Sequence, residues 1–66
     1  GSSEDLARIV QGASRHLKRG GALWMEHGWD QAQAVRDLLA AAGFQDVHSR
    51  QDLAGIERIS GGRLPA

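Results

Sequence analysis

The residues of this chain best suited to chemistry gather where one apolar segment ends. Glu26, His27, Gly28 and Trp29 follow the apolar run 22–25 and precede a segment with helical periodicity. A carboxylate and an imidazole are side chains that commonly act as general acid or base. In open α/β sheets, ligands bind beyond the carboxyl ends of the strands. The pattern therefore predicts a loop at a strand end that lines a site in a larger α/β enzyme.

Glu26 and His27 are neighbours on a predicted strand, so their side chains point to opposite faces. They cannot serve one reacting atom together without a bend, which Gly28 could supply. Two interpretations of Glu26 stay open: a cap or ion pair at the strand end, and a residue that lines the active site of the parent enzyme. Because no nucleophile or second partner is identifiable, we assign no catalytic residue within this chain.

Three histidines and two tryptophans raise the question of a metal site or a stacking site. The histidines, His16, His27 and His48, lie on three different predicted elements and lack the short spacing of metal-binding motifs, so no metal ligand is assigned. Trp24 falls inside the apolar segment, which favours a place in the core over stacking on an adenine ring. Trp29 follows the loop glycine, and both a substrate-lining role and simple exposure fit it.

The composition excludes several classes of partner. The chain of 66 residues has eight basic and eight acidic residues, interspersed along its length, and no cysteine. No basic block indicates direct nucleic-acid binding, and no apolar run approaches the ~20 residues of a membrane span. Without cysteine, no disulfide or zinc–thiolate site can stabilise so short a chain. We therefore expect self-association or a partner to contribute.

Hydrophobic periodicity predicts a helix, a strand and a second helix in the first two thirds of the chain. Residues 4–18 form an amphipathic helix, and its apolar stripe comprises Leu6, Ile9, Val10, Ala13 and Leu17. Residues 22–26 form a strand that is apolar without alternation, so both of its faces should be covered. Residues 30–42 form a helix with Asp30 as N-cap. Its apolar stripe comprises Val35, Leu38, Leu39 and Ala42.

The last third of the chain predicts a hairpin. Gly43 and Phe44 form a helix stop, and residues 46–51 form a strand. Residues 52–55 form a turn, and residues 56–60 return as an antiparallel strand. Residues 61–66 are expected to have little structure, and the glycine pairs of the chain are not in the order of a phosphate-binding loop. The element order is α-β-α-β-β.

The chain resembles the carboxyl-terminal part of the HemK-type enzymes, which methylate a glutamine side chain of peptide-chain release factors. The matching pieces are Leu17 to Gly21, Glu26 to Gln31, Ala32 to Val35, Leu38 to Phe44, and Asp52 to Gly55 with Arg58. The resemblance covers Leu6 to Arg63. Its most specific piece is Glu-His-Gly followed by a helix with Gln31, while the other helix and glycine pieces are generic.

This resemblance implies an S-adenosylmethionine-dependent, cytoplasmic protein methyltransferase that acts on the N5 amide of glutamine, with the release factor as its partner. It implies an α/β fold: the carboxyl-terminal α-β-α-β-β portion of a Rossmann-like class I methyltransferase sheet, ending in an antiparallel hairpin. Residues 4–66 are then the last third of the catalytic domain, and residues 1–3 are interpreted as a tag remnant. In the parent, Glu26, His27, Gly28 and Trp29 would line the substrate side.

Other parts of the family pattern are missing. The chain has no Asn and no Tyr, and its one proline is Pro65, so the Asn-Pro-Pro-Tyr segment that holds the substrate glutamine is absent. No glycine-rich cofactor loop follows a strand. We therefore expect this fragment to be inactive, to bind no S-adenosylmethionine, and to form a homo-oligomer, most simply a dimer. The alternative is a stand-alone α/β binding or oligomerisation module without enzymatic activity.

Overall fold

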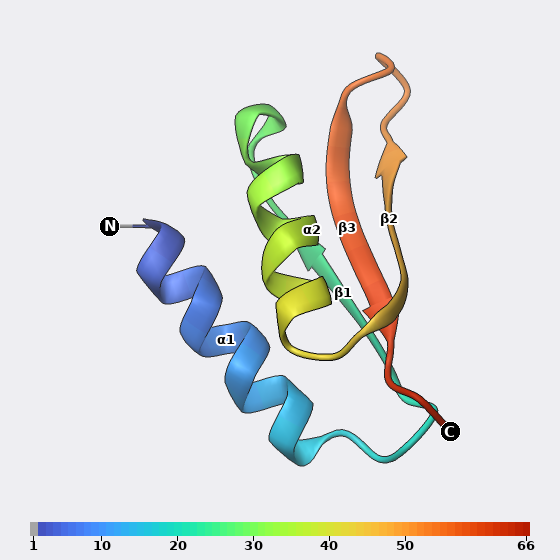
Figure 1. Ribbon diagram of the computed structural model, residues 1–66. Coiled ribbons are helices and arrows are strands. Elements are labelled where there is room, and N and C mark those ends of the chain that lie inside the picture. Colours follow the sequence, from blue (N-terminus) through green and yellow to red (C-terminus); the bar gives the residue numbers. More distant parts are fainter. Residues whose placement is uncertain (1) are drawn as a thin grey trace.

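The computed structural model describes residues 2–66, with side chains from residue 5 onward, as two helices on one face of a three-stranded sheet (Figure 1). The elements are α1 (Ser2–His16), β1 (Ala22–Glu26), the 3₁₀ helix η1 (Trp29–Gln31), α2 (Ala32–Ala41), β2 (Gln45–Gln51) and β3 (Glu57–Arg63). This confirms an α/β unit with the order α-β-α-β-β and a closing hairpin. Gly1, the first residue of the interpreted tag remnant, lies outside the described residues.

The sheet has the strand order β1-β3-β2, and β3 pairs antiparallel with both neighbours. The strands β1 and β2 therefore run in the same direction and are joined through α2, but they share no hydrogen-bonded edge. The closing hairpin predicted from the sequence thus adds one antiparallel strand beside strands of a single direction. Within the described residues every strand pairing is antiparallel, because β3 lies between the two strands that α2 connects.

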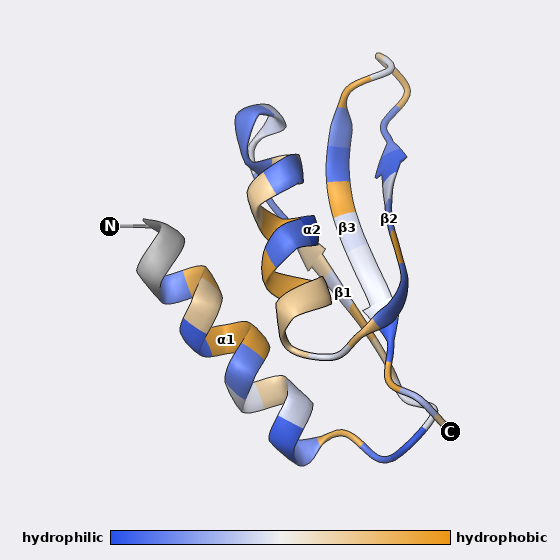
Figure 2. Ribbon diagram, viewed as in Figure 1, coloured by the Kyte–Doolittle hydropathy of each residue, from blue (hydrophilic) through white to orange (hydrophobic). Residues whose placement is uncertain are grey.

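The core lies between α2 and the sheet, with a contribution from α1. Its buried members are Val10, Met25, Val35, Leu39 and Phe44. Figure 2 shows apolar segments on the inner sides of both helices. Val35 and Leu39 are 0% exposed, which confirms the stripe predicted for the second helix. Leu38 and Ala42, at its margin, are half-buried against the same cluster.

Two apolar residues expected in the core lie at the surface. Ile9 is 54% exposed, because α1 turns Leu6 and Val10 inward instead, and Leu17 just beyond its end packs on the same cluster. Trp24 is 42% exposed, because the side chains of β1 alternate and that of Trp24 lies on the face opposite the helices. The expectation that both faces of this strand are covered is therefore wrong for the described chain.

The two helix boundaries that border β1 differ from those predicted. α1 ends at His16, two residues early, and the chain then turns through Gly20 at φ 82° to reach β1. Asp30 is not an N-cap but lies inside η1. Gln31 takes the capping part, because its side-chain oxygen accepts the N–H of Gly28 at 2.8 Å. The side chain of Gln31, which reaches back to Gly28, thus takes the capping role that was predicted for Asp30.

The end of α2 follows the prediction closely. Gly43 has φ 94° and donates its N–H to Ala40 O at 3.1 Å, while Phe44 donates to Leu39 O at 3.0 Å. This pair of bonds is the Schellman arrangement, which satisfies the last helical carbonyls. Phe44 is 5% exposed and packs into the core directly after the stop. The helix end therefore also directs the chain into β2.

The strand β3 is longer than predicted, because it continues through two glycines to Arg63. Gly61 and Gly62 are buried, and each lacks room for a side chain. A Cβ on Gly61 would overlap the Trp24 ring, and one on Gly62 would lie 3.0 Å from Phe44 Cβ. Glycine inside a strand often marks such a close approach. The expectation of an unstructured segment from residue 61 is therefore wrong for residues 61–63.

The turn between β2 and β3 is confirmed and is held by Asp52. Its carboxylate accepts the N–H of Ile56 at 3.0 Å and that of Ala54 at 2.8 Å, and Arg58 lies 3.4 Å away. The hydrogen bond from Ile56 is the main reason that the pKa of Asp52 lies below its ordinary value. Gly55 takes the left-handed position at φ 80°. The Asp-Leu-Ala-Gly piece thus has a structural role in the hairpin.

Candidate functional site

The loop after β1 carries all four residues proposed from the sequence to line a substrate site. The backbone N–H of His27 still bonds to Arg58 O at 2.9 Å, so the strand pairing extends to this residue. Glu26 is exposed, and no hydrogen bond or ion pair joins its side chain to the described residues. The side chain of His27 points the other way, beneath α2, which agrees with the predicted opposite orientation. Trp29 is 69% exposed.

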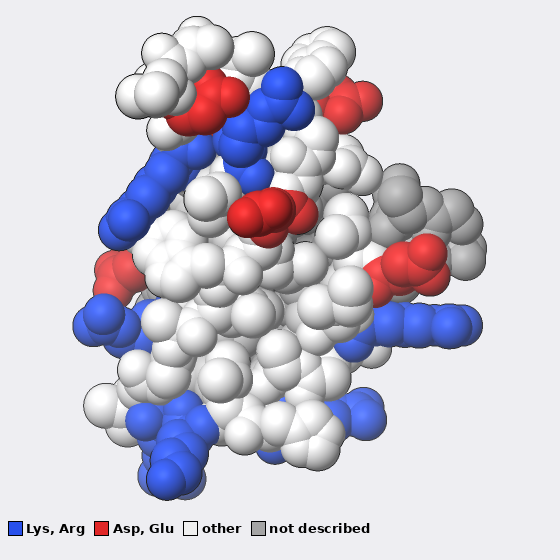
Figure 3. Space-filling view, turned by 180° about the vertical axis from the view of Figure 1, so that it is seen from behind, with Lys and Arg blue, Asp and Glu red and all other residues white. Residues whose placement is uncertain are grey.

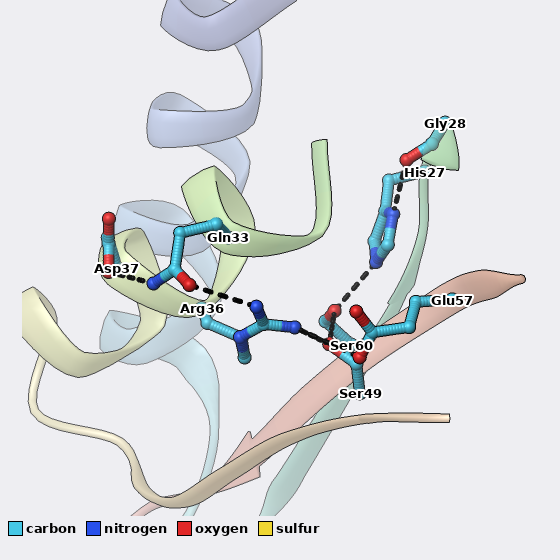
Figure 4. Close-up of polar contacts among 8 residues, drawn as sticks. All are labelled: His27, Gly28, Gln33, Arg36, Asp37, Ser49, Glu57 and Ser60. Atoms are coloured by element: carbon cyan, nitrogen blue, oxygen red, sulfur yellow. Dashed lines mark hydrogen bonds and ion pairs between the residues drawn. The ribbon is translucent and has the colours of Figure 1, made fainter. Parts of the chain in front are cut away.

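Both ring nitrogens of His27 are engaged (Figure 4). Nε2 lies 2.6 Å from Ser60 Oγ on β3, and Nδ1 lies 2.8 Å from the carbonyl oxygen of Gly28. Ser60 is 0% exposed. The pair superficially resembles the histidine and serine of a hydrolase. Because the hydroxyl has no access to solvent and no ring nitrogen is free, this arrangement supports no nucleophilic chemistry.

A line of polar contacts continues from Ser60 to α2. Ser60 Oγ lies 2.6 Å from Ser49 Oγ on β2, and Arg36 Nη1 donates to Ser49 Oγ. The same guanidinium pairs with Glu57 at 3.2 Å and donates to Gln33 Oε1 at 3.0 Å. Figure 4 shows these residues between α2 and the sheet. The contacts thus tie the helix, β2, β3 and the loop after β1 together.

Only weak signals for this network are present in the sequence. Ser49 lies within the strand predicted over residues 46–51, but neither it nor Ser60, Arg36 or Glu57 is singled out by the sequence pattern. A polar residue at a covered strand position requires a hydrogen-bond partner. That rule identifies the serines as candidates, whereas their pairing with His27 depends on the strand order and is visible only in the fold. Among the described residues, no buried side-chain polar atom lacks a partner.

A hollow lies on the open face of the sheet, with a volume of about 250 Å³. It is lined by Ala22, Trp24, Asp46, His48, Gly62 and Arg63. The rings of Trp24 and His48 meet edge to face with centroids 4.9 Å apart, and the Arg50 guanidinium lies 4.5 Å from the Trp24 centroid. Figure 3 shows this side of the molecule with basic and acidic side chains interspersed around a larger uncharged area.

The described residues hold no group of three or more His, Cys, Asp or Glu side chains arranged to bind a metal. Both ring nitrogens of His27 take part in the hydrogen bonds described above, and His48 Nδ1 lies 2.6 Å from the backbone oxygen of Asp46. The histidines thus stay on separate elements, as their spacing predicted. In the part of the chain that the structure describes, no helix is long and apolar enough to cross a membrane.

No protein-family model matches the chain. Curated proteins do match it, over nearly all of its length. It is 70% identical over 59 residues (89% of this chain) to a release factor glutamine methyltransferase of Bordetella pertussis. It is 70% identical over 60 residues (91% of this chain) to the protein of that name in Burkholderia pseudomallei, and 52% identical over 60 residues (91% of this chain) to that in Pseudomonas aeruginosa.

These three relatives share one name and are all described as release factor glutamine methyltransferases. The chain is homologous to a segment of the release factor glutamine methyltransferases, which confirms the family resemblance found in the sequence. The chain covers 22%, 21% and 22% of these three relatives, so it spans about one fifth of their length.

Proposed function

We propose that this chain is the carboxyl-terminal segment of an S-adenosylmethionine-dependent methyltransferase that modifies the side-chain amide of a glutamine in a cytoplasmic release factor. The observation that carries the proposal is the 70% identity to the Bordetella protein over 89% of the chain. In the whole protein, the segment would complete the sheet, and the loop formed by Glu26, His27, Gly28 and Trp29 would form a wall on the substrate side.

Within the described residues, neither glycine pair forms a loop of the kind that cradles the cofactor. Gly20 and Gly21 precede β1 instead of following a strand, so they cannot cradle a ligand at a strand end. The space above Gly61 and Gly62 is filled by Trp24, Phe44 and Val47. No residue of this chain is therefore assigned to S-adenosylmethionine, and the groups that bind the cofactor and the glutamine would come from the rest of the protein.

Cofactor binding tests this division of labour. We expect no measurable binding of S-adenosylmethionine to the chain alone in a calorimetric titration. In a chimera, this chain replaces the matching segment of the Bordetella relative, and we expect binding as tight as in that relative, because the 70% identity should preserve the contacts with the rest of the domain. Micromolar binding by the chain alone, or a folded chimera that binds no cofactor, would contradict the proposal.

Self-association of the isolated chain is the second candidate role, and the free edge of β1 favours it. Within the described residues β1 pairs only with β3, so its other edge presents unpaired backbone groups. Such an edge is a template for pairing with another chain. We expect a two-fold dimer of the chain alone in sedimentation equilibrium at ~100 µM, a concentration at which weak dimers form. A folded chain that remains monomeric there would rule this out.

A further inference from the structure

We propose that His27 and Ser60 are positioning residues, which hold the loop Glu26–Trp29 in place through a hydrogen-bond chain that begins at Arg36 and ends at the carbonyl of Gly28. This inference rests on the proposed function, because it gives that loop its task on the substrate side. The groups that carry it lie between the sheet and α2 (Figure 4).

The two ends of this series of hydrogen bonds have fixed directions, because Arg36 can only donate and the carbonyl of Gly28 can only accept. Ser49 Oγ accepts from Arg36 and keeps a proton that it can donate. The neighbour within reach is Ser60 Oγ, at 2.6 Å. Ser60 can in turn donate to His27 Nε2, also at 2.6 Å. In this order each hydroxyl accepts one bond and donates one.

The carbonyl of Gly28 bears on the form of the imidazole. Because that oxygen can only accept, the contact of 2.8 Å places a proton on Nδ1, which donates to it. In the proposed order, Nε2 accepts a hydrogen bond from Ser60 Oγ. The other neutral tautomer would place two lone pairs between Nδ1 and the carbonyl oxygen of Gly28. The tautomer of His27 is therefore a measurable property by which this series of hydrogen bonds can be tested.

The loop is also held from its far side. The N–H of Gly28 donates to Gln31 Oε1 at 2.8 Å, and Gln31 N–H donates to Gly28 O at 3.0 Å. The carbonyl of Gly28 thus receives one bond from His27 and one from the start of η1. With both backbone groups of Gly28 bonded, the next residue, Trp29, is presented outward at 69% exposure. An ordered loop loses less conformational entropy when a partner binds.

The guanidinium of Arg36, where this series of hydrogen bonds begins, is itself held in place. Glu57 lies 3.2 Å from its Nη1, and Gln33, itself bonded to Asp37 at 2.8 Å, accepts from its Nη2. The guanidinium is thus oriented from α2 and from β3 together. Ser60 is 0% exposed, so water cannot replace a lost partner without a rearrangement. The geometry of the loop therefore depends on residues far from it in sequence.

The arrangement distinguishes positioning from catalysis. A general base needs a ring nitrogen within reach of the substrate proton, and both nitrogens of His27 are committed. His27 is thus expected to affect how well the loop receives the release factor, and to leave the chemical step and its pH dependence unchanged.

The test uses the chimera with the Bordetella relative, in three variants: Ser60→Ala, His27→Asn and, as the matched control, Ser14→Ala. Ser14 is a helix residue outside the network, bonded only to Gln11 O at 2.8 Å. We expect Ser60→Ala to raise KM for the release factor about tenfold, the effect of roughly one unsatisfied buried polar group. The kcat, its pH profile and the S-adenosylmethionine affinity should stay near those of the Ser14→Ala variant.

His27→Asn tests the bond to Gly28 separately, because the Asn amide can still donate to the Gly28 carbonyl. We therefore expect this variant to raise KM for the release factor less than Ser60→Ala does. It also serves if Ser60→Ala fails to fold. Nitrogen NMR of the unsubstituted chimera should show His27 protonated on Nδ1. An Nε2-protonated ring, KM values equal to that of the control, or loss of kcat with one limb of the pH profile in His27→Asn would overturn the inference. Failure of the unsubstituted chimera to methylate would instead contradict the proposed function.

Discussion

Replacing Leu39 with Ala is expected to lower the free energy of unfolding by about 2–5 kcal/mol, the range for a large core residue cut to Ala. Leu39 is 0% exposed and lies in the cluster that joins α2, β1 and the start of β2. Its carbonyl also accepts the Phe44 N–H in the helix stop. The substitution would therefore leave a cavity where α2 and the sheet both pack on the Leu39 side chain. Urea denaturation measures the loss in the free energy of unfolding.

Leu38→Ala is the matched control, since it removes the same atoms one position along the helix. Leu38 is only half-buried, at the edge of the core. We expect it to lose clearly less stability than Leu39→Ala. Equal losses, or a loss near zero for Leu39→Ala, would show that the buried face of α2 is wrongly assigned. For a domain of this size a loss of several kcal/mol approaches the whole stability, so the chimera is the better host.

Gly61→Ala is expected to destabilise the protein by about 1–3 kcal/mol, the usual range for overpacking. The added methyl group would overlap the Trp24 ring and lie 2.5 Å from the carbonyl oxygen of Leu23. The ring could rotate away, but the carbonyl belongs to the paired strand β1 and cannot. Thermal unfolding followed by circular dichroism measures the effect.

Gly12→Ala is the counterpart with the opposite expected sign. Gly12 lies inside α1, and a Cβ there would meet nothing within 4 Å. Alanine is favoured over glycine in a helix by about 0.5–1 kcal/mol, so this variant should be slightly more stable. If Gly61→Ala proved as harmless as Gly12→Ala, the close approach of β1 and β3 described above would be incorrect.

The sequence predicted those parts of the fold that depend on local chemistry. The strand predicted over residues 22–26 has the observed bounds. The helix ends before Gly43 and the hairpin turns at Asp52, as these residue types predict. The parts that depend on distant neighbours were missed. Gly61 and Gly62 resemble a chain end because glycine is rare in strands, and only the packing of Trp24 and Phe44 explains them.

The candidate site divides in the same way. Its loop could be predicted, because an apolar run ending in Glu-His-Gly is visible in one segment of sequence. The partner of His27 could not, because Ser60 lies 33 positions away and reaches it only through the order of the strands. Trp24 was placed in the core because an apolar run has no marker for an open sheet face. Local patterns thus located the site, and the topology supplied its support.

Methyl transfer by the chimera is the most direct test of the central claim that this chain is a working segment of a release factor glutamine methyltransferase. The chimera and the unaltered Bordetella relative are each incubated with S-adenosylmethionine and a release factor, and the digested factor is analysed by mass spectrometry. We expect a glutamine-containing peptide to gain the mass of one methyl group in both reactions, at rates within about tenfold of each other, or ~1.4 kcal/mol in activation free energy. A folded chimera that binds the cofactor but leaves every glutamine unmodified, beside an active relative, would contradict the account.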